Sequence, residues 1–126
     1  MMLLDTCALL WLVEGSARLS AETKQSIDRE AIVAVSAISA FEIALKYRHN
    51  KLTLPMPPEE WWERSSAHHR IDILDLTPAV AMRATRLPAV HKDPADRFII
   101  ATAMEHNATV VTGDRRFAEY GIRILT

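Results

Sequence analysis

Short apolar runs alternate along the chain with longer segments in which apolar residues recur at every third or fourth position. The runs are typical of buried strands, and the longer spacing is typical of amphipathic helices. Strands are expected at residues 2–4, 31–35, 71–76, 108–112 and 122–125. Strands that alternate with helices in this way favour an α/β fold, in which helices flank a central parallel sheet.

The expected helices begin where a capping residue or a proline precedes an apolar stripe. These starts are Asp5 or Thr6, Ser20, Ser36 or Ser39, Pro58, Pro78 and Pro94, with a brief helix after Gly113-Asp114. Side chains of Ser, Thr and Asp accept hydrogen bonds from the free N–H groups of the first turn, and proline has no N–H to leave free. The third helix is expected to span Ala37 to about His49. The proline-rich residues 50–58 are expected to form a loop.

Trp61 and Trp62 are neighbours on the helix that begins at Pro58. Adjacent residues cannot share one helical face. One tryptophan is therefore expected to pack in the core, while the other covers a neighbouring helix or a partner surface.

The composition is that of an ordinary globular protein. With 126 residues, of which 49% are hydrophobic and 25% charged, residues 1–126 are expected to form one soluble domain. Cys7 is the only cysteine, which excludes an internal disulfide and a cysteine-based zinc site. No apolar run approaches the roughly 20 residues that cross a bilayer, so we expect a cytoplasmic protein without a membrane span. Because the net charge is −1, binding of RNA would depend on a local basic patch.

Two aspartates stand just past the carboxyl end of an expected strand. Asp5 follows the first strand, and Asp114 follows the strand at residues 108–112. Ligands of open α/β sheets bind at this edge, although helix capping alone would also explain either aspartate. The conjunction of these aspartates with further acids favours a functional site.

A glutamate lies within the apolar stripe of the third helix. Glu42 shares one helical face with Ile38, Phe41 and Leu45. Burying an isolated charge is costly, so Glu42 is expected to be paired, to ligate a metal or to lie at the edge of a cleft. An ion pair with Lys46, one turn later, is the alternative that the pattern leaves open.

Two acids crowd the start of the helix at Pro94. Asp93 is placed as the N-cap, and capping alone explains it. Asp96 lies on or beside the apolar stripe of Ile99 and Ile100, which favours a functional role.

Carboxylates gathered in one crevice repel each other unless a cation neutralises them, and hard oxygen ligands suit Mg²⁺ or Mn²⁺. Hydrolysis of a phosphodiester is the metal-assisted chemistry that fits. The candidate catalytic and metal-binding residues are Asp5, Glu42, Asp96 and Asp114, with Asp93 as a secondary ligand and Thr6, Thr112 and Arg97 as auxiliary residues. Cations near these motifs, which would rim the crevice, are Lys46, Arg48, Lys51, Lys92, Arg97, Arg115 and Arg116.

Four stretches of the chain resemble the motifs of PIN domains, and in particular of VapC-type toxins. They are Leu-Leu-Asp-Thr at 3–6, Ser-Ala-Phe-Glu-Ile at 39–43, Asp-Pro-Ala-Asp-Arg-Phe-Ile-Ile-Ala at 93–101 and Val-Thr-Gly-Asp at 111–114. The resemblance implies a PIN-like three-layer fold, Mg²⁺- or Mn²⁺-dependent cleavage of RNA, inhibition by a cognate antitoxin whose tail occupies the cleft, and a homodimer. It also implies that Asp5, Glu42, Asp96 and Asp114 form the family's acidic quartet, with Asp93 and Asp96 competing for the third place.

Two other classes of protein fit parts of the pattern. A non-catalytic interaction module would use the aspartates as caps and Glu42 in a boundary ion pair, and would bind no divalent ion tightly. A phosphatase of the haloacid-dehalogenase type would need a second aspartate two residues after the nucleophile, and Cys7 occupies that position.

Overall fold

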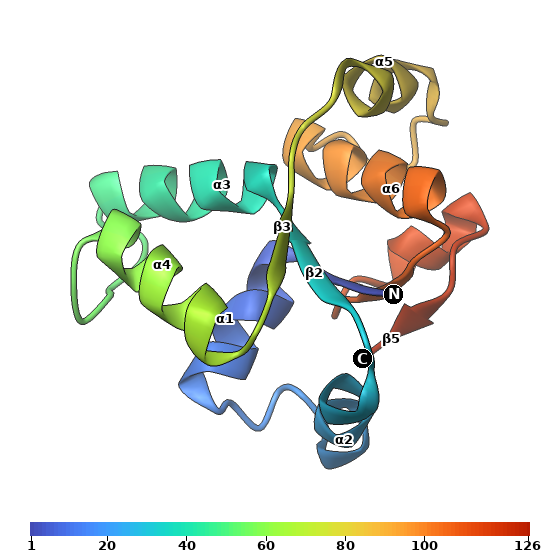
Figure 1. The fold of residues 1–126 in the computed structure, drawn as a ribbon. Helices are drawn as coiled ribbons and strands as arrows, with labels where there is room; N and C mark the ends of the chain where they lie inside the picture. Colours follow the sequence, from blue (N-terminus) through green and yellow to red (C-terminus); the bar gives the residue numbers. More distant parts are fainter.

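A five-stranded parallel sheet forms the centre of the molecule (Figure 1). Its strands in chain order are β1 (Met2–Leu4), β2 (Val33–Ser36), β3 (Asp72–Leu74), β4 (Thr109–Val111) and β5 (Ile124–Leu125). Their order across the sheet is β3-β2-β1-β4-β5, and every pairing is parallel. The computed structural model describes all residues from 1 to 126. The expected α/β fold is confirmed, although β3 and β5, at the sheet edges, are shorter than the apolar pattern suggested.

Six α-helices and one 3₁₀ helix connect and follow the strands. They are α1 (Thr6–Glu14), α2 (Ala21–Arg29), α3 (Ala37–Arg48), α4 (Pro58–His68), α5 (Pro78–Arg86), α6 (Pro94–His106) and the 3₁₀ helix η1 (Arg115–Tyr120). The side chains that cap them by accepting a first-turn N–H are Asp5, Ser20, Ser36, Thr77, Asp93 and Asp114. None of these helices combines the length and the apolar character that a membrane span requires.

Alternate side chains of the central strands enter two different cores. Leu4 and Val35 point to the face that α1, α2, α3 and α4 cover. Leu3 and Ala34 point to the opposite face, which α6 and η1 cover. This period of two arises because successive side chains of a strand project to opposite sides of the sheet. Phe117 is fully buried in the second core and holds η1 against the sheet.

The helix α5 forms an additional layer outside α6. Val80 and Ala84 of α5 pack on Ala101 of α6 in a small apolar cluster. Figure 1 accordingly shows α5 lying across the outer side of α6, away from the sheet. The apolar stripe expected on this helix is therefore confirmed.

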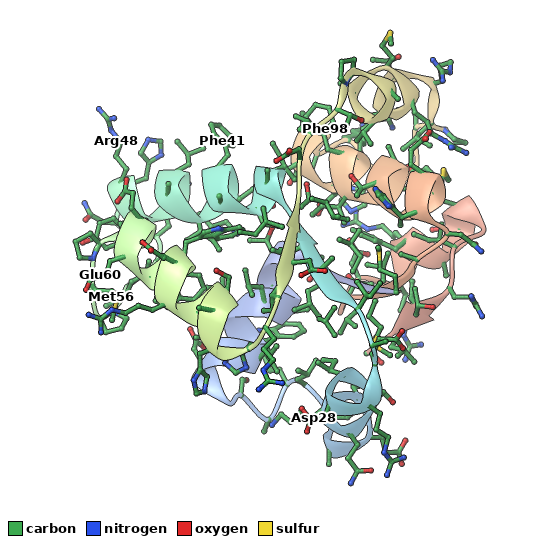
Figure 2. All side chains as sticks on the ribbon, viewed as in Figure 1. Asp28, Phe41, Arg48, Met56, Glu60 and Phe98 are labelled. Atoms are coloured by element: carbon green, nitrogen blue, oxygen red, sulfur yellow. The ribbon has the colours of Figure 1, made fainter.

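The buried face of α3 is not the face that the sequence predicted. Its fully buried residues are Ser39 and Ile43, whereas Phe41 is 60% exposed and Leu45 is 40% exposed. Phe41 points outward from the helix in Figure 2. The apolar stripe through Phe41 and Leu45 is therefore not the buried face of α3. Ser39 and Ile43 face inward instead, and Ser39 Oγ lies 2.9 Å from Thr6 Oγ1 of α1. Glu42 is half-buried at the boundary between the two faces.

The adjacent residues Trp61 and Trp62 lie in two different environments, as expected. Trp61 is only 4% exposed and belongs to the core between α1, α2, α3 and the sheet. Trp62 is half-buried and faces α3, where it lines a groove with Ala40 and Ile43. This contact positions α4 against the helix that carries Glu42.

Candidate functional site

Three strands end together at the middle of the sheet. Leu4 of β1 is paired with Val35 of β2 on one side and with Val111 of β4 on the other. The residues that follow these strands therefore meet at one edge of the sheet. Asp5 is the first residue after β1 and lies at the centre of this edge.

Asp5 is both a helix cap and a buried acid. Its Oδ1 accepts a hydrogen bond of 2.8 Å from the N–H of Ala8, in the first turn of α1, and the residue is only 7% exposed. Burial raises the pKa of Asp5 above its ordinary value, because it disfavours the charged form. Hydrogen bonding from Thr112 and Ala8 lowers this pKa, and the negative charge of Asp114 raises it.

The helix α3 brings Glu42 beside the start of α1. The Thr6 hydroxyl donates a hydrogen bond to Glu42 Oε1, and the Oγ1 atom of Thr6 also lies 2.9 Å from Ser39 Oγ. Burial raises the pKa of Glu42, and the Thr6 hydroxyl lowers it. The nearby charge of Asp93 raises this pKa as well, whereas Lys46 lowers it. The direct partner of Glu42 is thus Thr6, and no ion pair joins it to Lys46.

The start of α6 supplies two acids with different environments. Asp93 is exposed and caps the helix, since its Oδ1 accepts a hydrogen bond of 3.0 Å from the N–H of Ala95. Asp96 is half-buried, and burial is the largest cause that raises its pKa to about 6. Repulsion from Asp93 raises this pKa further, and the neighbouring His91 opposes the rise.

Asp114, which follows β4, is surrounded by hydrogen-bond donors. Its Oδ1 accepts from the backbone N–H and from Nε of Arg116, each at 3.0 Å, and its Oδ2 accepts from Arg116 Nη2 at 2.8 Å. His91 Nε2 lies 2.7 Å from the same Oδ2 atom. The Arg116 guanidinium, with a smaller contribution from His91, holds the pKa of Asp114 well below its usual range. The N–H of Asp114 donates to Thr112 Oγ1 at 3.0 Å, which ties the acid to the end of β4.

His91 is a site residue that the sequence reasoning missed. It is only 4% exposed, and its Nε2 lies 2.7 Å from Asp114 Oδ2 and 3.3 Å from Asp96 Oδ2. It comes from the segment between α5 and α6, where no apolar periodicity marks a buried side chain. The available signal was its position, two residues before the capping Asp93 and five before Asp96.

The candidate acids converge, although not all to the same degree. His91, Asp96 and Asp114 each offer a ligand atom within 4.8 Å of the others. Asp5 and Glu42 are not in that compact group, but their charges act on the pKa of Asp96. Capping and clustering coexist here, because the capping aspartates also act on neighbouring acids. The charge of Asp114 raises the pKa of Asp5, and the charges of Asp5 and Asp93 raise those of Glu42 and Asp96. A set of carboxylates whose burial disfavours ionisation, with oxygen as the main donor atom, fits a hard divalent cation.

A comparison with known families covers almost the whole chain. The family model described as "PIN domain" matches residues 2–122. The chain belongs to the PIN domain family. The resemblance drawn from its four short motifs is thereby confirmed. Nucleases of this family generally depend on a metal.

Three known proteins align with this PIN domain over nearly their full length. It is 38% identical over 119 residues to "Ribonuclease VapC22" of Mycobacterium tuberculosis, and the aligned part covers 94% of this chain and 90% of that protein. It also shares its fold with VapBC2 from Rickettsia felis bound to a promoter DNA fragment, with a TM-score of 0.73, 16% identity and coverage of 99% and 98% of the two chains. A toxin-antitoxin complex from Klebsiella pneumoniae gives a TM-score of 0.67 at 24% identity, with coverage of 100% and 97%.

Arg97, an auxiliary candidate, does not contact the acids of this PIN domain. Its guanidinium donates only to backbone carbonyl oxygens, namely those of Ala84, Leu87, Pro88 and His91, at distances from 2.7 to 3.1 Å. Its effect on the site is indirect, because these bonds fix the segment that carries His91. The cations that do act on the acids are Lys46 and Arg116.

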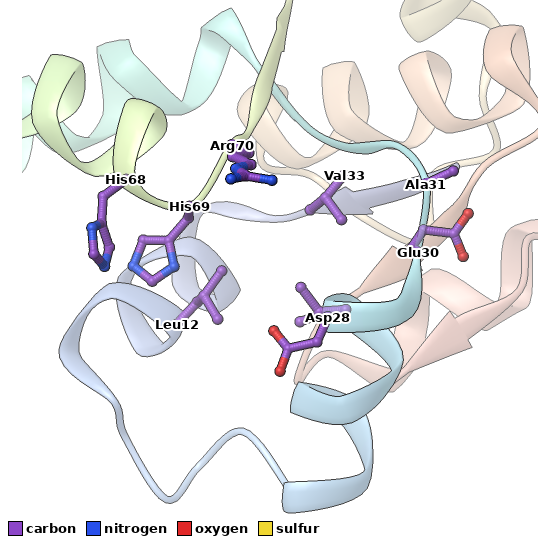
Figure 3. A pocket seen from close by; sticks show the side chains of 9 residues that line it. Leu12, Asp28, Glu30, Ala31, Val33, His68, His69 and Arg70 are labelled. Atoms are coloured by element: carbon purple, nitrogen blue, oxygen red, sulfur yellow. The ribbon is translucent and has the colours of Figure 1, made fainter.

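Several cavities of the PIN domain are lined by residues other than the acids. A cavity of about 350 Å³ lies at the other end of the sheet, where Leu12, Asp28, Val33 and His69 contribute to its wall (Figure 3). Val33 begins β2, whereas Asp5 and Asp114 follow the carboxyl ends of β1 and β4. Asp93 is exposed, and Glu42, Asp96 and Asp114 are half-buried, so this group of acids reaches the molecular surface, where a large substrate can approach it.

Proposed function

We propose that this PIN domain is a metal-dependent endoribonuclease that hydrolyses phosphodiester bonds of cytoplasmic RNA, and that it is the toxin of a toxin-antitoxin pair. The observation that carries the proposal is the convergence of carboxylates from four parts of the chain at the carboxyl end of the sheet. Burial raises the pKa of three of them, Asp5, Glu42 and Asp96, so a bound cation would favour their ionised forms. The 38% identity to a protein named as a ribonuclease supports RNA as the substrate.

Asp5, Glu42, Asp96 and Asp114 would hold the ion, with Asp93 at the rim of the set. Oxygen ligands of this kind suit Mg²⁺ or Mn²⁺ better than a softer metal. When bound, such an ion supplies a Lewis acid and a water of lowered pKa for attack on phosphorus.

The chain's own residues orient these ligands. Thr6 donates to Glu42 and thereby fixes its carboxylate beside α1. Thr112 accepts from the N–H of Asp114 and also lowers the pKa of Asp5, so a single buried hydroxyl serves the acids of both strand ends. Hydroxyl groups in these positions leave the carboxylates ionisable without adding positive charge.

Binding of RNA depends on local cations, because the net charge of the chain is −1. Arg115 and Arg116 follow Asp114 directly and are exposed, and Lys46 lies one turn after Glu42 on α3. These side chains can meet phosphates at the edge of the acid cluster. Arg48 is exposed at the carboxyl end of α3, farther along the helix from Glu42, so it is less suited to bind a phosphate at the site (Figure 2).

The proposed partners are a cognate antitoxin and a second copy of the chain. A similar fold is found in a toxin-antitoxin complex, which supports the first partner. The exposed apolar side chains Phe41 and Leu45 on α3 support a homodimer, because burying apolar side chains of this size in an interface is favourable. Light scattering on the wild type and on Phe41→Glu would test the dimer separately from the activity.

The function is tested by incubating the purified chain with RNA and with a phosphomonoester, each with Mn²⁺ or with a chelator. We expect cleavage of RNA only, and only with the metal. A non-catalytic module would cleave neither substrate, and a phosphatase would hydrolyse the phosphomonoester. Growth arrest on expression that a neighbouring gene product relieves would support the toxin role.

A further inference from the structure

His91 links two candidate ligands that come from different elements. Its Nε2 lies 2.7 Å from Asp114 Oδ2, at the start of η1, and 3.3 Å from Asp96 Oδ2, in the first turn of α6. No hydrogen bond or ion pair joins these aspartates directly, and no other side chain forms a hydrogen bond or an ion pair with both. The imidazole is thus the sole direct link between them.

Packing alone does not account for a histidine at position 91. The ring stands edge-on to Phe117, with centroids 5.5 Å apart, and the residue is 4% exposed. Its second nitrogen, Nδ1, is buried without a hydrogen-bond partner. An unpartnered buried nitrogen is unfavourable, and a phenyl ring would fill the same space without it. The contacts of Nε2 are therefore the reason that a histidine suits this position.

The backbone around His91 is fixed on both sides. Its N–H lies 2.7 Å from Tyr120 Oη, and that hydroxyl in turn donates to the carbonyl of Pro88 at 2.8 Å. Its own carbonyl accepts a hydrogen bond of 2.9 Å from Arg97 Nη1. The direction in which Nε2 points is accordingly set by groups from both α6 and η1.

We propose that His91 is a positioning residue that holds Asp114 and Asp96 at a spacing suited to a divalent ion, without ligating that ion itself. An ionised carboxylate only accepts hydrogen bonds, so Nε2 carries the hydrogen that it shares with Asp114. An Nε2 atom that keeps its hydrogen has no lone pair for a metal. The inference rests on the proposed metal-dependent function and adds to it a residue outside the four acids.

Two substitutions separate the roles of the ring and of its N–H group. His91→Phe keeps an aromatic ring against Phe117 and removes the donor, whereas His91→Gln keeps an N–H donor. Loss of such an outer partner typically weakens metal binding by about 10–100-fold, and we expect this for His91→Phe in calorimetric titration with Mn²⁺. His91→Gln should recover part of the loss, and His68→Phe, at an exposed histidine far from the acids, should bind as the wild type does. Thermal melting in chelator identifies any variant that does not fold.

The wild type provides a test that needs no substitution. In ¹H–¹⁵N spectra of its imidazole nitrogens, the Nε2 hydrogen of His91 should remain when Mg²⁺ is added. Loss of that hydrogen with a metal-induced shift of Nε2 would make His91 a direct ligand and overturn the proposal. Unchanged Mn²⁺ affinity in a folded His91→Phe would overturn it as well. In either case metal-dependent RNA cleavage by the wild type would stand, whereas a wild type that neither binds Mn²⁺ nor cleaves RNA would remove the proposed function too.

Discussion

The carboxylates at the sheet edge fall into two groups with opposite electrostatics. Burial raises the pKa of Asp5, Glu42 and Asp96. Asp114 has a pKa well below its usual range, chiefly because the Arg116 guanidinium binds both of its oxygens. Repulsion by neighbouring acids raises the pKa values of the first group further, whereas Asp114 already has a cation from the protein.

The difference indicates what a bound ion changes in each group. For the first group, an ion adds positive charge to acids that form no ion pair with a lysine or an arginine. For Asp114, an ion must compete with donors that are already present, since His91 and Arg116 occupy both oxygens. Because the Arg116 side chain is 57% exposed and the His91 side chain only 4%, Arg116 is the donor that can leave.

Asp5→Asn should produce the largest effect, because it removes a charge from the group that needs the ion. We expect RNA cleavage to fall by at least about 100-fold. Asn caps helices as well as Asp does, so thermal stability in chelator should not fall. Asp28→Asn, at the opposite end of the sheet, is the matched control and should cleave as the wild type does. Equal activity of both variants would remove Asp5 from the site.

Asp96→Asn should change how stability depends on pH. The folded pKa of Asp96 is about 6 and its ordinary value is 3.8, so between these values the folded state binds more protons than the unfolded state. The free energy of unfolding of the wild type in chelator should therefore decline as the pH rises from about 4 to about 6. Asp96→Asn lacks this loss and should be more stable above pH 6, by on the order of 1 kcal/mol. If the denaturation midpoints of the wild type and of Asp96→Asn differed by the same amount at pH 4 and at pH 8, the assignment would be contradicted.

Thr6→Val should have a smaller effect on catalysis. The substitution keeps the volume of the side chain and removes the hydroxyl that donates to Glu42. We expect about a tenfold loss of RNA cleavage and about 1 kcal/mol of lost stability. Thr85→Val, at an exposed threonine on α5, controls for the change of residue type. A loss of stability without a loss of cleavage would assign Thr6 to packing alone.

Arg116→Ala should produce the smallest effect, and in the opposite direction for metal binding. An exposed ion pair is weak, so removing the competing cation should tighten Mn²⁺ binding by only roughly 2–5-fold. The neighbouring Arg115 makes no ion pair and provides the control Arg115→Ala. Weaker Mn²⁺ binding in Arg116→Ala alone would mean that Arg116 supports the site rather than competing with the ion.

The sequence predicted the parts of the molecule that follow from local chemistry. Asp5, Asp93 and Asp114 could be placed because capping residues and strand ends have local signatures. The buried face of α3 could not be inferred, because the pattern of Phe41 and Leu45 does not reveal that the smaller Ser39 faces the neighbouring helices.

The site residues that could not be predicted are placed by the path of the chain between helices and strands. His91 becomes buried only because the segment after α5 folds back over η1, and no periodicity records that path. Arg97 was ambiguous for a similar reason, since a sequence does not show whether a guanidinium meets phosphates or carbonyls.

The bonds of Arg97 have a consequence for variation in the segment before α6. Since this guanidinium recognises only main-chain oxygens, residues such as Leu87 can change type while the anchoring remains. Arg97 itself has no such freedom, because lysine offers a single ammonium in place of a planar set of donors. The geometry of that connection is therefore set largely by two side chains outside it, Arg97 and Tyr120.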